Sequence, residues 1–381
     1  MNVRVLPVMW LLMLSQGCTP TLTPVFARQA TPLTAQSNSP RVLWLLDNSG
    51  SMYMPTDPTA PGCLPGCGNP GQQCPPTCPT RQTALQEGLG LFQAALSPST
   101  THALVVYPSD PLCGPPTSFE VLDQPFPQVT ARVAALSPQG GTPTAGALQF
   151  AAGIAPLAQA ETFVVLVTDG LPNCNAENPH HACSLPDGSD GGVADAAAVA
   201  EQLQACRCTA STCSNQLCSL GCLDELGTVA ASHRLVEQEM PLMVIGLGAD
   251  LGSGVARAAL SSMEIALGPD CTSAVDCGGS SCGADGHCTE KLFLAPTGPD
   301  FARAASTLAA ALERSVRCTW WLPRQVTASA LEVELGGVLV SPEDWTLQGG
   351  AEQRVVITGA PCDRLLAGEE SPSISWLPPA E

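Results

Sequence analysis

Five short and largely apolar runs constrain the fold of this chain more than any other feature. They are the segments 41–46 (RVLWLL), 102–107 (HALVVY), 162–168 (TFVVLVT), 241–246 (PLMVIG) and 291–295 (KLFLA). Apolar runs of this length without alternating polar residues are typical of strands that are buried on both faces of a sheet. A sheet made of such strands needs a covering layer on each side.

Segments with helical periodicity lie between these runs. Apolar residues recur there at every third and fourth position, in residues 81–96, 129–136, 144–158, 224–238 and 301–316. Alternating strands and helices predict an α/β fold with a doubly wound, mainly parallel sheet. Residues 119–122 could add a short antiparallel strand at one edge.

The pattern changes after Cys318. Polar and apolar residues alternate over 326–335, a Gly336-Gly337 turn follows, and 338–340 and 354–358 are further strand-like stretches. This predicts a small β-rich unit over residues 318–381. Cys318 and Cys362 flank these strands and are candidates to form a disulfide with each other.

The first 17 residues have the pattern of a secretory signal peptide. One positive charge precedes an apolar stretch that is too short to span a bilayer. The stretch ends in LSQGC, which resembles the lipobox of bacterial lipoproteins with Cys18 as the lipidated residue, although Gln16 stands where that pattern has a small residue. The alternative is plain cleavage within residues 27–30, which would release a secreted or periplasmic protein.

Lipidation at Cys18 would make the chain a lipoprotein of a Gram-negative bacterium. Thr19 follows the cysteine, whereas an Asp there would resemble an inner-membrane retention signal, so we expect the outer membrane. Residues 18–40 are rich in Thr, Pro, Ala, Gln and Ser, which predicts a flexible tether. The membrane is then contacted only through the lipid anchor.

The chain has 19 cysteines, which in an exported protein indicate disulfides. Without Cys18, an even number of 18 remains. Most of these lie in three inserts, at 53–80, 174–222 and 271–288. The second insert has seven cysteines and Cys113 stands alone, so we expect Cys113 to bridge two loops.

Zinc is the alternative role for these cysteines. The first insert has the spacing C-x3-C-x6-C-x3-C, formed by Cys63, Cys67, Cys74 and Cys78, and four thiolates can hold zinc. Export and the prolines between the cysteines favour disulfides.

Charge excludes one class of partner. The chain has 34 acidic and 15 basic residues, a formal net charge of −19. Nucleic-acid binding needs a high density of basic residues, so we expect no nucleic-acid partner.

Oxygen-bearing side chains follow two of the predicted strands. The first strand runs into Asp47, Ser49 and Ser51 in a D-x-S-x-S pattern, and the third ends just before Asp169. Thr142 lies in a Gly-Gly-Thr-Pro-Thr loop that opens a predicted helix. Each of these residues alone could equally be a helix-capping or turn residue. Together at the carboxyl edge of a parallel sheet, they form a set of hard oxygen ligands for Mg²⁺, Ca²⁺ or Mn²⁺.

These pieces, in this order, resemble the metal-ion-dependent adhesion site of the von Willebrand factor A domain. The resemblance covers residues 41–316 and fills all five motif positions: Asp47, Ser49, Ser51, Thr142 and Asp169. It implies a vWA-like domain over 41–317, a cation held by the hydroxyls, aspartates that act largely through water, and an acidic side chain from a protein partner.

We therefore expect a cell-envelope adhesion or binding protein, not an enzyme, that engages a protein partner through a divalent cation. Two alternatives stay open. One is a metal-dependent hydrolase that uses the same cation to activate water. The other is a purely structural envelope scaffold.

Overall fold

The computed structural model describes most of the chain outside the N-terminal segment and the second and third inserts. The described residues are 31–33, 36–37, 40–69, 72–111, 113–154, 161–170, 172, 174, 224–248, 251, 254–269, 281–283, 288–289, 291–295, 298–349, 353–368 and 372–376. The predicted signal peptide, Cys18, and most of the second and third inserts lie outside them. Among the described residues, no helix is long and apolar enough to cross a membrane.

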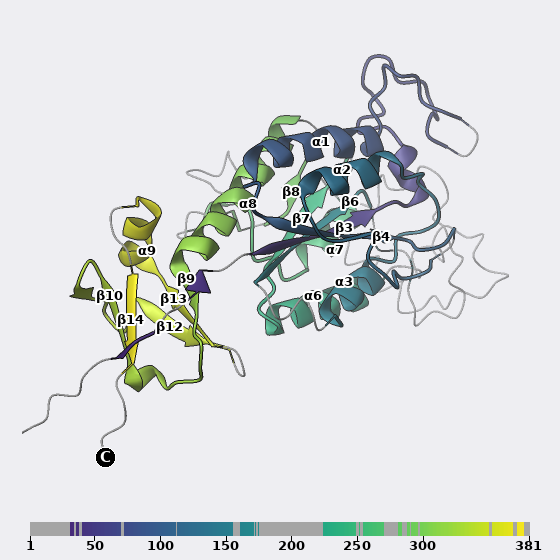
Figure 1. Cartoon of the computed structure of the whole chain (residues 1–381). Helices are drawn as coiled ribbons and strands as arrows, with labels where there is room; N and C mark the ends of the chain where they lie inside the picture. The colour runs from purple at the N-terminus through teal and green to yellow at the C-terminus, as the bar shows by residue number, and fades with distance from the viewer. Residues whose placement is uncertain are drawn as a thin grey trace, which may run out of the picture.

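A six-stranded sheet forms the centre of the larger part of the chain (Figure 1). Its order is β5 (Val121–Gln124), β4 (Thr101–Tyr107), β3 (Arg41–Asp47), β6 (Thr162–Thr168), β7 (Leu242–Gly246) and β8 (Phe293–Leu294). All neighbouring pairs are parallel except β4 with β5 at the edge. The doubly wound, mainly parallel sheet and the five strands predicted for it are thus confirmed, and the antiparallel edge strand predicted at 119–122 lies at Val121–Gln124.

Helices cover both faces of the sheet. Successive residues of β3 face opposite layers, as a strand with a period of two requires. Trp44 and its even-numbered neighbours pack with residues of α1 (Arg81–Ala95), α2 (Phe126–Ala134) and α8 (Gly298–Cys318). Leu43 and Leu45 pack with residues of α3 (Thr144–Ala152), α6 (Glu225–Glu237) and α7 (Gly254–Ser261).

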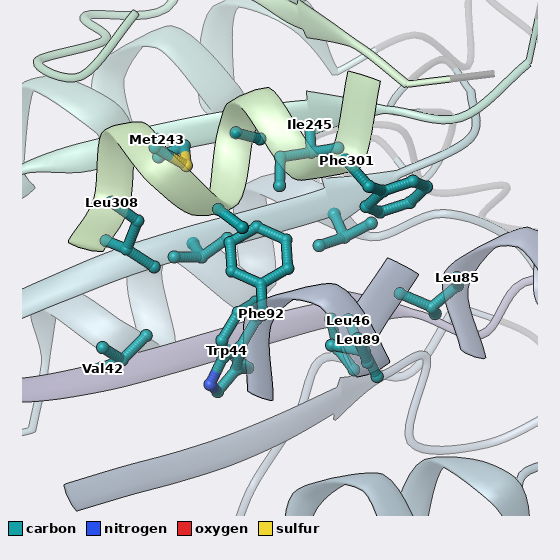
Figure 2. Packing of buried hydrophobic residues seen from close by; sticks show 14 of the residues in the cluster. Val42, Trp44, Leu46, Leu85, Leu89, Phe92, Met243, Ile245, Phe301 and Leu308 are labelled. Atoms are coloured by element: carbon teal, nitrogen blue, oxygen red, sulfur yellow. The ribbon is translucent and has the colours of Figure 1, made fainter. Parts of the chain in front are cut away.

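The first of these cores contains Trp44, the largest fully buried side chain among the described residues (Figure 2). The indole ring of Trp44 makes edge contacts with Phe92 and Phe126, at centroid distances of 5.0 and 5.4 Å. α1 and α8 approach closely at Gly88, where a Cβ atom would lie 2.3 Å from the ring of Phe301. Any side chain at this position would force the ring of Phe301 to move.

His102 is a buried titratable group in the same core. Its Nδ1 accepts a hydrogen bond from Nε1 of Trp44 at 3.3 Å, and the residue is 1% exposed. Burial lowers the pKa of His102 from 6.5 to about 4, because an apolar environment disfavours the charged ring. The imidazole is therefore neutral in the folded protein at pH 7.

We predict that His102 makes the folded protein less stable at acid pH. Between pH 6.5 and 4 the unfolded chain binds a proton at this residue and the folded chain does not, so stability falls as the pH is lowered. The loss should reach about 3 kcal/mol over the interval. Urea unfolding gives the free energy of unfolding of the wild type and of His102→Asn, which keeps an acceptor for Trp44. If the wild type and the variant differ by the same free energy at pH 7 and at pH 4.5, the prediction is wrong.

The C-terminal unit consists of two small antiparallel sheets around a separate core. Its elements are β9 (Thr319–Trp321), β10 (Leu331–Leu335), β11 (Val338–Leu339), β12 (Trp345–Gln348), β13 (Arg354–Ile357), α9 (Gly359–Leu366) and β14 (Pro372–Trp376). The hairpin around Gly336-Gly337 and the strand β13 are as predicted. The strand predicted over 326–335 is shorter, because Ala328–Ala330 form a 3-10 turn before β10.

Two short segments of the predicted tether pair with this unit. β1 (Thr31–Pro32) lies antiparallel to β14, and β2 (Gln36–Ser37) lies antiparallel to β9. The last part of the 18–40 segment is therefore joined to the C-terminal unit by strand pairing.

Disulfides tie the described loops as expected. Cys318 pairs with Cys362 and so joins the end of α8 to α9. In the first insert, the pairs are 63 with 78 and 67 with 74. Cys113 bridges to Cys174, so the loop after β4 is joined to the loop after β6. All four cysteines of the first insert are thus in disulfides, as predicted.

Candidate metal centre

The candidate site lies at the carboxyl edge of the central strands β3 and β6. These strands are parallel neighbours, with Leu46 opposite Val167, so their last residues lie side by side. The hydroxyl of Thr168 donates a hydrogen bond of 2.7 Å to Oδ2 of Asp47. Asp169 follows directly, and both aspartates are fully buried, at 1% and 0% exposed.

Hydrogen bonds hold the carboxylate of Asp47 in one orientation. Its Oδ1 accepts a bond of 2.8 Å from the backbone N–H of Ser49, and its Oδ2 accepts the bond from Thr168. The first of these bonds joins residues two apart and stabilises a local turn. Asp47 therefore both stabilises this turn and belongs to the candidate site.

The two serine hydroxyls continue from Asp47 toward Asp169. The hydroxyls of Ser49 and Ser51 are 2.9 Å apart, and that of Ser51 donates to Oδ1 of Asp169 at 2.9 Å. Ser49 precedes the 3-10 turn Gly50–Tyr53, but its side chain makes no capping hydrogen bond there. Ser49 therefore does not cap this turn through its side chain, and the two hydroxyls are linked to each other and to Asp169.

The loop that contains Thr142 is held against this segment by backbone contacts. The N–H of Gly50 donates to the carbonyl of Gly140 at 3.0 Å, and the N–H of Gln139 donates to the carbonyl of Asn48 at 2.7 Å. Gly140 has a φ of +76°, which favours glycine at this turn. Thr142 is 2% exposed, and it is not the N-cap residue of α3, because Pro143 occupies that position. All five predicted positions thus lie at one edge of the sheet.

Arg81 is a further residue of the site that the sequence pattern did not indicate. Its Nη1 donates to both the carbonyl and Oδ2 of Asp169, each at 3.2 Å. It is the first residue of α1, where the helix dipole disfavours a positive charge. A basic residue at that unfavourable position is the one signal in the sequence that could have drawn attention to it.

The electrostatics of the site favour a bound cation. Burial, and secondly the negative charge of Asp169, raise the pKa of Asp47 to about 7, although its hydrogen bonds act in the opposite direction. Burial and the nearby charge of Asp47 also raise the pKa of Tyr107 well above its usual value. A divalent cation beside Asp47 would favour the ionised carboxylate and so offset the cost of its burial.

The donor set fits a hard cation. The site offers hydroxyl and carboxylate oxygens and no thiol or imidazole among the five residues, which is the preference of Mg²⁺, Ca²⁺ and Mn²⁺. The hydroxyls of Ser49, Ser51 and Thr142 would bind such an ion. The carboxylates, both already hydrogen-bonded, would orient those hydroxyls and any bound water.

No family model matches the chain, and no curated protein matches it either. Solved structures similar to it include the pilus adhesin SpaC from Lactobacillus rhamnosus GG, at 11% identity and a TM-score of 0.39, covering 91% of this chain and 40% of SpaC. A von Willebrand factor type A structure from Catenulispora acidiphila matches at 12% identity and a TM-score of 0.36, covering 91% of this chain and 59% of the other.

A third similar structure is the von Willebrand factor domain of the type V pili tip protein Mfa5 from Porphyromonas gingivalis. It matches at 14% identity and a TM-score of 0.41, with 77% of this chain and 99% of that domain covered. The chain spans less than two thirds of SpaC and of the Catenulispora structure.

Proposed function

We propose that this chain is an exported binding protein of the bacterial cell envelope that engages a protein partner through a divalent cation. Asp47, Ser49, Ser51, Thr142 and Asp169 hold the cation, and an acidic side chain of the partner completes its coordination. Mg²⁺ is the ion we expect, with Ca²⁺ or Mn²⁺ as substitutes.

One observation carries this proposal. The hydroxyls of Ser49 and Ser51 are hydrogen-bonded to each other and lie between two buried carboxylates: the backbone N–H of Ser49 donates to Asp47, and the hydroxyl of Ser51 donates to Asp169. Buried carboxylates are costly unless they are paired or bind a metal ion. An edge of a parallel sheet that carries such a group is also where α/β proteins bind ligands.

The placement of the C-terminal unit supports display of this site. Arg354 of β13 pairs with Glu239 at 2.6 Å, and Glu239 lies just before β7, at the amino ends of the parallel strands. The C-terminal unit and the N-terminal segment joined to it therefore lie at the end of the sheet opposite the candidate site (Figure 1). An anchor at Cys18 would leave the metal edge facing away from the membrane.

Affinity capture from envelope extract tests the proposal. Purified protein is incubated with extract in Mg²⁺ or in chelator, and bound proteins are identified by mass spectrometry. We expect a partner that is retained in Mg²⁺ and released by chelation. Retention of the same proteins under both conditions would refute a cation-mediated contact.

A further inference from the structure

Arg81 places a positive charge inside a site that is suited to a cation. Its side chain is 4% exposed and that of Asp169 is 0% exposed, so water screens this pair little. A buried arginine normally serves to neutralise an acid. Here the acid belongs to the candidate metal centre, and the arginine competes with any cation for it.

The position of Arg81 is fixed by the same loop that carries the serines. The backbone N–H of Arg81 donates to the carbonyl of Met54 at 2.9 Å, and Pro55 forms a β-bridge with Thr80. Thr80 also caps α1 through a reciprocal pair of bonds with Thr83. The two ends of the first insert are thus held together directly beside the site.

The charges of the site can be counted from these residues. Among the described residues, Asp47 and Asp169 supply two negative charges when ionised and Arg81 supplies one positive charge, so these three side chains together carry one net negative charge. A bound divalent cation turns this into one net positive charge. Without Arg81, the same loaded site would be neutral.

We propose that Arg81 is a positioning residue that sets the charge of this site, a role that rests on the proposed function. It holds Asp169 in place and weakens binding of the cation alone. It also leaves one positive charge in the loaded site, which a single carboxylate neutralises. Binding of the cation and of an anionic group thereby become mutually dependent, as reciprocal coupling requires.

Mn²⁺ titrations of Arg81→Met at pH 8, with and without acetate at constant ionic strength, test this role. Acetate is the probe for the anionic group, and electron paramagnetic resonance measures free Mn²⁺. In the wild type, acetate should tighten Mn²⁺ binding. In Arg81→Met, Mn²⁺ alone should bind at least about tenfold more tightly, because a nearby buried positive charge has been removed. The effect of acetate should become smaller, because the loaded site no longer carries a net positive charge, although acetate can still coordinate the ion.

Two further variants isolate the charge. Arg81→Lys keeps it and should stay close to the wild type in both titrations. Arg41→Met is the matched control, because Arg41 pairs with Asp123 at 2.6 Å at the opposite end of β3. If Arg81→Met does not fold, Arg81→Gln can replace it in the same Mn²⁺ titrations, because glutamine also lacks the charge but retains a hydrogen-bond donor for Asp169.

The outcomes separate this proposal from the proposed function. Weaker Mn²⁺ binding in Arg81→Met, or unchanged binding with an unchanged acetate effect, would overturn the role of Arg81 and leave the cation site intact. A wild-type protein that binds no Mn²⁺ would overturn both. A merely structural arginine would not be expected, when replaced, to tighten Mn²⁺ binding and at the same time reduce the acetate effect.

Discussion

Replacing Asp47 and Asp169 together by asparagine should abolish Mg²⁺ binding while the protein stays folded. Asparagine keeps an oxygen that can accept from Ser49 or Ser51 but removes both negative charges. Loss of groups that orient metal ligands typically weakens metal binding by about 10- to 100-fold each, so the pair should bring it below detection. Calorimetric titration with Mg²⁺ measures the loss.

Asparagine is the better choice than alanine because of Arg81. The change Asp169→Ala would leave the buried guanidinium without its counter-ion, which typically costs about 3–5 kcal/mol of stability. The change Asp169→Asn still offers the guanidinium a side-chain carbonyl oxygen. The matched control is Asp123→Asn, a substitution of the same kind on the exposed edge strand β5.

Circular dichroism and urea unfolding show whether the variant is folded. Mg²⁺ binding that persists in the folded double variant would contradict the assignment of these residues. A loss of Mg²⁺ binding in the Asp123→Asn control would show that the assay reports general surface charge and not the site.

Trp44→Ala should be among the most destabilising substitutions in the central sheet. Trp44 is 0% exposed and makes an edge contact with Phe92 of α1 (Figure 2) and another with Phe126 of α2. Truncation of a buried aromatic residue to alanine removes apolar burial and leaves a cavity, a loss of about 3–5 kcal/mol. Urea unfolding followed by circular dichroism measures the change.

Trp376→Ala is the control for this substitution. Trp376 is partly exposed in the C-terminal unit, where the guanidinium of Arg324 lies 3.8 Å from its ring centroid. An interaction of this kind at a partly exposed position is worth about 1 kcal/mol. If Trp44→Ala costs no more than Trp376→Ala, the packing described for the central sheet is wrong.

The central sheet could be predicted because its strands are buried on both faces. Residues such as Val164, Val165 and Leu166 leave no polar face, and a run of this kind has few other stable conformations in an α/β chain. Helix ends were less predictable. α2 begins at Phe126, before the apolar periodicity starts, and α3 ends at Ala152, next to Gly153.

The C-terminal unit was predictable only in part. β12, β14 and α9 are short, and their residues are only partly buried, so they lack a clear periodic signal. β1 and β2 have two residues each and depend on pairing with β14 and β9, far along the chain. No local property of a Thr-, Pro- and Ser-rich segment indicates such a pairing.

The candidate site, too, could be predicted from the sequence only in part. Asp47, Ser49, Ser51, Thr142 and Asp169 stand in an ordered pattern at strand and loop ends, which the sequence displays directly. Arg81 and Thr168 contact the aspartates through the tertiary fold. Their roles depend on which strands are neighbours in the sheet and on where α1 begins. A sequence pattern does not give either piece of information.

A crystal soaked in Mn²⁺ and measured at the manganese absorption edge tests the central claim most directly. An anomalous difference map locates the ion without assumptions about partner or activity. We predict a single strong peak among the hydroxyl oxygens of Ser49, Ser51 and Thr142, absent from crystals of the double asparagine variant. A map with no peak at this edge of the sheet, or with one that persists in the variant, would contradict the account.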